Sequence, residues 1–279
     1  MKHARIAYMP LATYPEAVGD EAILAAAGFA ASLGCRLHVT VFSVDIPRMS
    51  SPLGSFLVNV PGLVHAAKEK SKAECQRLLG LVQKAGEALF DVHCKQREVV
   101  IGGAFDVSAA EARYYDLAVL PWSGETMAAQ DMAQCVVFGS GRPVILVPPS
   151  ARPAPLDHIA IAWDGSRVAA RALGDILPLL REGGRVSVLT VEDEKSLSGP
   201  DIAGALASSL GRRDITAAPI ETTLGNRSIA EALQVMALSQ GAQLLAMGGF
   251  GHSRVRDFVL GGATQGVLAH LQLPTLLSH

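Results

Sequence analysis

The feature that most constrains this chain is an internal repeat, because one succession of short apolar runs and longer amphipathic segments occurs twice. The predicted strands lie at 5–10, 37–44, 92–100, 117–120 and 143–147 in the first copy, and at 158–163, 186–191, 216–223, 244–247 and 274–277 in the second; the third strand of each copy is more polar than the others. Short apolar runs bounded by polar residues are typical of buried strands, and the segments between them have helical periodicity. The sequence therefore predicts two copies of one strand–helix unit.

Strands that alternate with helices at this spacing predict right-handed β-α-β crossovers and a parallel sheet with helices on both faces. We therefore expect an α/β fold made of two Rossmann-like, doubly wound, five-stranded parallel sheets in tandem. The proline-rich segment Pro148–Pro155 separates a domain at 1–150 from a domain at 156–279. Ligands of such sheets bind beyond the carboxyl ends of the strands, where the strand order reverses.

Composition supports two folded domains and excludes several classes of protein. The chain has 279 residues, of which 49% are hydrophobic and 18% charged, which is typical of globular domains. A net charge of −2 and only 5% aromatic residues argue against nucleic acid as a partner. No apolar run is long enough to span a membrane or to act as a signal peptide, so we expect a cytoplasmic protein. The four cysteines form no C-x-x-C pair, which indicates reduced thiols.

Candidate ligand-binding residues gather in the second copy. Its fourth strand is followed by Gly248-Gly-Phe-Gly251, and after nine residues by Gly261-Gly262-Ala-Thr264 at the start of the last predicted helix. Glycine lets a backbone approach a ligand closely, and a helix N-terminus offers N–H donors to phosphate. Asp164 follows the first strand of this copy, where a carboxylate can accept hydrogen bonds from a ribose or adenine. These features point to a nucleotide site, although glycines after a strand are also common turn residues.

The chain resembles the universal stress proteins, whose nucleotide-binding members carry Gly-x2-Gly-x9-Gly followed by Ser or Thr. The resemblance covers both copies and implies an adenine nucleotide alpha hydrolase-like fold that binds ATP, with or without Mg²⁺, in the second copy only. It implies that Asp164 and the backbone of Val191 hold the adenine, that Gly248 packs by the ribose, and that glycines of the loop line the phosphates. The full candidate set is Asp164, Val191, Met247, Gly248, Gly251, His252, Gly261, Gly262, Ala263 and Thr264. Gly262 stands where binding members have Ser or Thr, so one hydroxyl donor is missing.

The first copy lacks the features of this site. With the last strands of the two copies in register, Pro121 falls opposite Gly248 and Asp131 opposite Gly262; with the first strands in register, Leu11 falls opposite Asp164. Proline has no N–H and a carboxylate repels phosphate, so the first copy should not bind a triphosphate in the same manner. It carries instead a long connection, Ile46–Leu63, that either packs on its own domain or covers a pocket or a partner surface.

These observations favour a stress-response regulator that binds ATP or a related adenine nucleotide in its C-terminal domain. The alternative is a nucleotide-free binding or scaffold module that recognises a partner protein or a small apolar ligand. Hydrolysis should be slow at most, because the sequence offers no catalytic base; a hydrolase that uses His252 or a metal is a third reading. We expect the last strands, at 144–147 and 275–277, to pair about a pseudo-two-fold axis, as they do between single-domain members of the family. The sequence leaves open whether the tandem chain forms a homodimer.

Overall fold

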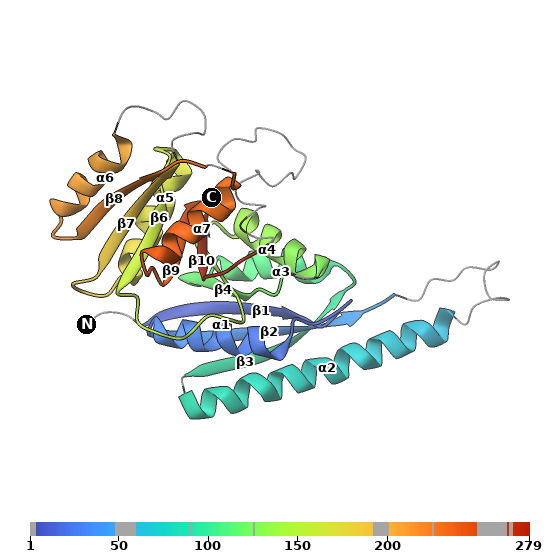
Figure 1. Ribbon diagram of the computed structural model, residues 1–279. Helices are drawn as coiled ribbons and strands as arrows, with labels where there is room; N and C mark the ends of the chain where they lie inside the picture. The colour runs from blue at the N-terminus through green and yellow to red at the C-terminus, as the bar shows by residue number, and fades with distance from the viewer. Residues whose placement is uncertain are drawn as a thin grey trace.

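The computed structural model describes residues 4–47, 60–89, 91–124, 126–191, 201–224, 226–249, 267 and 270–279 (Figure 1). The elements of the first half are β1 (Arg5–Ala12), α1 (Asp20–Ser32), β2 (Cys35–Asp45), α2 (Val60–Leu89), β3 (Val92–Val100), α3 (Gly103–Ala112), β4 (Leu117–Pro121), α4 (Met127–Ser140) and β5 (Val144–Val147). The second half has β6 (His158–Ala162), α5 (Arg167–Ile176), the 3₁₀ turn η1 (Leu177–Leu179), β7 (Arg185–Val191), α6 (Ile202–Gly211), β8 (Thr216–Thr222), α7 (Ile229–Ser239), β9 (Leu244–Gly248) and β10 (Thr275–Ser278).

The described strands form one ten-stranded sheet in the order β3-β2-β1-β4-β5-β10-β9-β6-β7-β8. Within each half the neighbouring strands are parallel, whereas β5 and β10 pair antiparallel at the centre. The two halves therefore have the same strand order, and a pseudo-two-fold axis passes through the pair Ile145–Leu276. This confirms the α/β fold class and the predicted pairing of the last strands, which join the two predicted five-stranded sheets into one.

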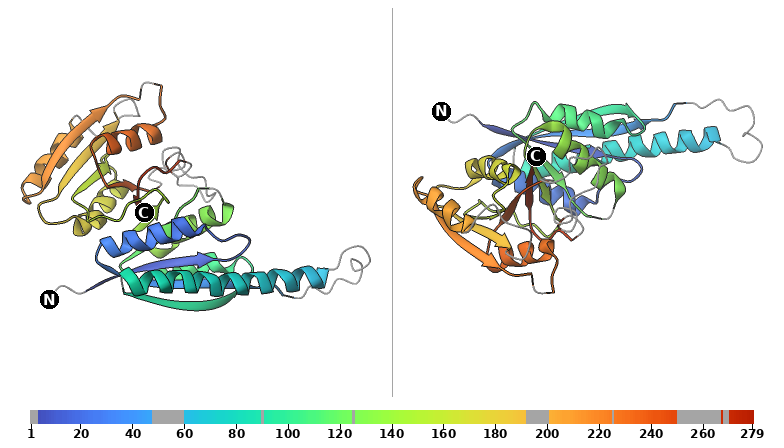
Figure 2. Two further views of the ribbon diagram at one scale, coloured as in Figure 1. Left: turned by 60° about the horizontal axis from the view of Figure 1, so that its bottom comes forward. Right: turned by 90° about the horizontal axis from the view of Figure 1, so that it is seen from above.

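Helices cover both faces of the sheet (Figure 2). One core cluster joins side chains of α1, α2, α5 and α6 with one face of both halves. Two further clusters pack α3, α4 and α7 against the opposite face. Strands β4, β5 and β10 are covered on both sides and are buried at every residue, which explains why their sequences are largely apolar.

Two helix boundaries differ from the sequence pattern, and a proline is involved in each. Helix α2 begins at Val60, inside the predicted connection, because Pro61 falls in the first turn, where a missing N–H costs no hydrogen bond. It runs past the ends of the neighbouring strands (Figure 1). Helix α5 ends at Ile176, although its apolar face continues in the sequence to Leu180, because Pro178 cannot donate the next helical hydrogen bond and a 3₁₀ turn follows.

The linker between the halves packs against both of them. Pro153 lies so close to helix α1 that a Cβ on Gly28 would be 2.8 Å from its Cγ. At the other end of the linker, the Gln243 side chain donates to the carbonyl of Pro155 at 2.7 Å and accepts from the backbone N–H of Asp157 at 2.7 Å. The linker is thus held between α1 of the first half and the start of β9 in the second.

Candidate functional site

Three strand ends meet in the second half at the place where the strand order reverses. Strand β6 lies between β7 and β9 and is parallel to both, so the three carboxyl ends lie at one edge of the sheet (Figure 1). The backbone N–H of Trp163 donates to Leu189 at 2.8 Å, and the Thr190 hydroxyl donates to the carbonyl of Trp163 at 3.0 Å. These bonds fix the chain just before Asp164 beside the end of β7, so Asp164 and Val191 follow neighbouring strands.

Asp164 is exposed and also shapes the turn that starts helix α5. Its Oδ1 accepts the backbone N–H of Ser166 at 2.8 Å, and the intervening Gly165 has a φ of 74°, which favours glycine. The Ser166 hydroxyl in turn accepts the N–H of Ala169 at 3.2 Å and caps the helix. The carboxylate therefore has a structural role whether or not it also contacts a ligand.

Gly248 ends β9 where the backbone of α5 comes very close. A Cβ at this position would lie 2.6 Å from the Val168 Cγ2, 2.7 Å from the Val168 carbonyl carbon and 2.8 Å from the Ala169 nitrogen. Two of these atoms belong to the helix backbone and cannot move without shifting the helix. Strand–helix packing alone therefore requires glycine here, a role that the glycine spacing in the sequence did not reveal.

The structure describes part of the predicted site. Asp164, Val191, Met247 and Gly248 lie at the three neighbouring strand ends, and the Met247 side chain is buried in the core at 5% exposure. The remaining predicted residues, which are Gly251, His252, Gly261, Gly262, Ala263 and Thr264, lie outside the described residues.

The sheet register allows the first half to be compared with this edge. Pro121 pairs with Val147 on β5, as Gly248 pairs with Ser278 on β10, so Pro121 occupies the position of Gly248, as predicted. The prediction for Asp164 was wrong by one residue: the pairings of β1 and β6 with their neighbours place Ala12, not Leu11, opposite it. The error arose because strand β1 has no sequence marker of its register.

In the first half, the hydroxyl groups of Thr13 and Ser71 form hydrogen bonds with the backbone near the end of β2. Phe42 is the register equivalent of Val191, and its carbonyl accepts a hydrogen bond from the Thr13 hydroxyl at 2.7 Å. Thr13 also lies 2.6 Å from the Ser71 hydroxyl of helix α2, which accepts the backbone N–H of Val44 at 2.8 Å. All four residues are buried, so protein groups already bond the backbone that would face an adenine.

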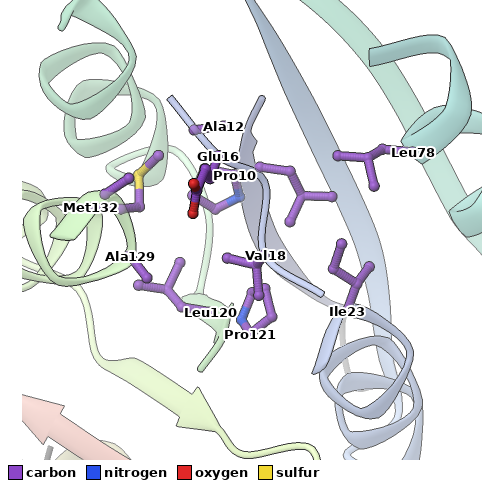
Figure 3. A pocket seen from close by; sticks show the side chains of 12 residues that line it. Pro10, Ala12, Glu16, Val18, Ile23, Leu78, Leu120, Pro121, Ala129 and Met132 are labelled. Atoms are coloured by element: carbon purple, nitrogen blue, oxygen red, sulfur yellow. The ribbon is translucent and has the colours of Figure 1, made fainter. Parts of the chain in front are cut away.

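A hollow of about 420 Å³, including the solvent at its open mouth, lies at the ends of β1 and β4 in the first half. It is lined by Pro10, Leu11, Ala12, Glu16, Val18, Ile23, Leu78, Leu120, Pro121, Ala128, Ala129 and Met132 (Figure 3). The sequence alone does not reveal this hollow, although Pro10 and Pro121 in the two strands and the pair Ala128–Ala129 at the start of helix α4 all line it.

The Glu111 carboxylate of helix α3, in the first half, is held by several hydrogen-bond donors. Glu111 accepts hydrogen bonds from the Tyr8 hydroxyl at 2.8 Å and the Thr40 hydroxyl at 2.9 Å, and pairs with Lys95 at 3.0 Å and Arg97 at 2.7 Å. Burial would raise the pKa of Glu111, but these hydrogen bonds outweigh it and lower the pKa to about 2. The carboxylate is thus saturated with partners and anchors α3 to the sheet.

Two properties of the described residues bear on other classes of site. Within the described ranges, no group of three or more His, Cys, Asp or Glu side chains is placed to hold a metal ion. None of the helices in the described part of the chain combines the length and the apolar character needed to cross a membrane.

Comparison with solved structures shows the same fold over almost the whole chain. A universal stress protein from Archaeoglobus fulgidus matches with a TM-score of 0.69 at 14% identity, covering 97% of this chain and 95% of its own. A putative universal stress protein from Pseudomonas aeruginosa UCBPP-PA14 matches with a TM-score of 0.57 at 14% identity, covering 98% and 93%. A functionally unknown protein from Pseudomonas aeruginosa PAO1 matches with a TM-score of 0.55 at 14% identity, covering 98% and 92%.

Comparison with known sequences gives a family match in the second half of the chain. No curated protein matches the chain significantly. The model of the Universal stress protein family matches residues 155–279, the half that contains Asp164, Val191 and Gly248. Residues 155–279 of this chain are therefore a universal stress protein domain.

Proposed function

We propose that the chain is a tandem universal stress protein, with a degenerate domain at 1–150 and an intact one at 156–279, and that it acts as a cytoplasmic stress-response regulator. In this proposal the second domain binds ATP or a related adenine nucleotide. The observation that carries it is the meeting of Asp164, Val191 and Gly248 at the strand-order reversal of the domain that matches the family. The repetition of one strand order about the pseudo-two-fold supports the tandem organisation.

The residues at this edge suit the adenine and ribose end of a nucleotide. The exposed Asp164 carboxylate can accept from an amino or hydroxyl group, and the backbone at Val191 and Met247 offers further hydrogen-bonding groups. The phosphates, with or without Mg²⁺, would be held by the glycine loop, namely by Gly251, His252, Gly261, Gly262, Ala263 and Thr264. We assign no catalytic residue, and the nucleotide would act by changing the affinity for an unidentified protein partner.

Calorimetric titration with ATP and Mg²⁺ tests the proposal. Asp164→Ala should weaken binding by about 10-fold or more, since a hydrogen bond to a charged group contributes about 1.5–3 kcal/mol. Asp164→Asn keeps an acceptor for Ser166 and should lose less. Asp157→Ala is the matched control, because Asp157 is an exposed aspartate just before the opposite end of the same strand.

The glycine loop is tested separately. A Gly251→Val/Gly261→Val double variant should abolish binding if the loop holds the phosphates. Equal affinity of the wild type, the Asp164 variants and the loop variant would refute the proposed site. Absence of any binding heat for the wild type would refute nucleotide binding altogether.

A second candidate function is a nucleotide-free binding module that recognises a small apolar ligand or a partner protein. The specific observation in its favour is the apolar hollow of the first half, which occupies the place of a nucleotide site. Native mass spectrometry of the purified chain separates the two candidates, because only the first predicts bound adenine nucleotide. The same spectra show whether the tandem chain forms a homodimer.

A further inference from the structure

The hollow of the first half lies where ligands of doubly wound sheets bind. Its walls come from the ends of β1 and β4, from the loop after β1, and from helices α1, α2 and α4. The strand order reverses between β1 and β4, so this is the switch point of the first half.

The lining is unsuited to a nucleotide and suited to an apolar molecule. Eleven of the twelve lining side chains are apolar (Figure 3). Pro10 and Pro121 remove a backbone N–H from each of the two switch-point strands, and among the residues that the structure describes no lysine, arginine or histidine lines the hollow. An anionic group placed here would lose water without gaining a donor, which disfavours phosphates and carboxylates.

Among the described lining residues, the one charged group is the Glu16 carboxylate. Glu16 lies in the loop after β1 and is exposed, so its charge stays solvated at the mouth of the hollow while the apolar side chains form the walls. Figure 3 shows the carboxylate among the apolar side chains of the lining, near Pro10. A ligand with an apolar body and a cationic end would complement both parts of this arrangement.

We propose that the hollow of the first half binds a small apolar amine, with its apolar body against the proline, alanine and leucine side chains and its ammonium group at Glu16. The inference rests on the second candidate function and is independent of nucleotide binding in the second half. It assigns an organic cation to the first half, whether or not the second half binds a nucleotide.

A series of three ligands with the same alkyl chain tests the charge. The full-length protein, with its methionine methyl groups labelled with carbon-13, is titrated with hexylamine, hexanol and hexanoate, and the Met132 methyl resonance is followed. Ligands of this size should bind with a Kd on the order of 1 mM. Hexylamine should bind about threefold more tightly than hexanol, the size of effect expected of an exposed ion pair. Hexanoate should bind more weakly than hexanol.

Two variants locate the binding. Glu16→Gln is a surface change and should make hexylamine and hexanol equal. Ala128→Phe fills the hollow and should abolish the shift for all three ligands, whereas Met127→Phe, at the adjacent position that is 79% exposed and outside the lining, should not.

The outcomes separate this inference from the functions on which it depends. The predicted order of affinities, lost in Glu16→Gln, supports it. Equal binding of amine and alcohol, or preference for hexanoate, overturns the cation assignment but leaves a small apolar ligand as the second candidate function. No binding by any member of the series overturns both, while ATP binding in the second half is unaffected by either result.

Discussion

Replacing Gly248 by alanine tests whether packing, apart from any ligand, requires this glycine. The added methyl carbon would meet the first turn of helix α5 at 2.6–2.8 Å, and two of the three nearest atoms are backbone. Gly249 is a matched control at the next position. A Cβ there would lie 3.5 Å from the Ser278 carbonyl oxygen and 3.6 Å from the Val137 Cγ1, which is ordinary van der Waals contact.

The expected effect follows from the difference between the two variants. Both substitutions reduce the conformational entropy of the unfolded chain equally, by about 0.4–1 kcal/mol in favour of folding. Gly249→Ala should therefore leave the free energy of unfolding unchanged or slightly raised. Gly248→Ala adds the strain of inserting a methyl group into a packed interface, about 1–3 kcal/mol. The free energies of unfolding should differ by that amount.

Urea unfolding in the absence of nucleotide measures this difference. Fluorescence of Trp163 in a Trp122→Phe background reports on the second half alone, because these are the two tryptophans of the chain. With an m value of about 3 kcal/mol per molar, the midpoint of Gly248→Ala should fall by roughly 0.3–1 M relative to Gly249→Ala. Equal midpoints for the two variants would refute the packing argument and leave ligand binding as the reason for the glycine.

Three further predictions concern the first half. Ser71→Ala leaves the buried N–H of Val44 without its acceptor and should lower the free energy of unfolding by about 1–3 kcal/mol, measured with urea. The pKa of Glu111 is about 2 in the folded protein and 4.5 for a free side chain. The contribution of this carboxylate to the stability of the fold is therefore complete above about pH 4.5 and is lost as the pH falls toward 2. Glu111→Gln should remove this component of the acid transition, which is followed by circular dichroism. Burial raises the pKa of Cys35 and Cys75 to about 11, so both should react with a thiol reagent more slowly than the two half-buried cysteines, and a fast reaction at either would contradict the burial.

Most of the ten strands were predictable because buried strands of this fold are continuous apolar runs, whereas the exposed edge strands β3 and β8 were predictable only from their place in the repeat. Each predicted strand overlaps the observed one, and the last strands lie side by side as expected, in an antiparallel pair. Boundaries that depend on single residues were less predictable. Pro178 ends α5 earlier than its apolar face suggests, and Pro61 begins α2 inside a segment that the sequence assigned to a loop.

Features of the candidate site that depend on neighbouring residues in the sequence were predictable, whereas features that depend on contacts between distant residues were not. Asp164 follows a strand, and that alone placed it at the ligand edge. The contact between Gly248 and α5 brings together residues about 80 positions apart, so no local pattern could reveal it. The same holds for the bond from Thr13 to Phe42 and for the apolar hollow, which joins residues between Pro10 and Met132.

The central claim is that the two halves share one fold but differ in what they bind, with a single nucleotide site in the second half. Native mass spectrometry of the chain in excess ATP and Mg²⁺ counts the nucleotides directly. We expect one nucleotide per chain, lost in Asp164→Ala and retained in Glu16→Gln. Two nucleotides per chain would contradict the inference that Thr13 and Pro121 make the first half unsuited to a nucleotide, and none would contradict the nucleotide site at Asp164.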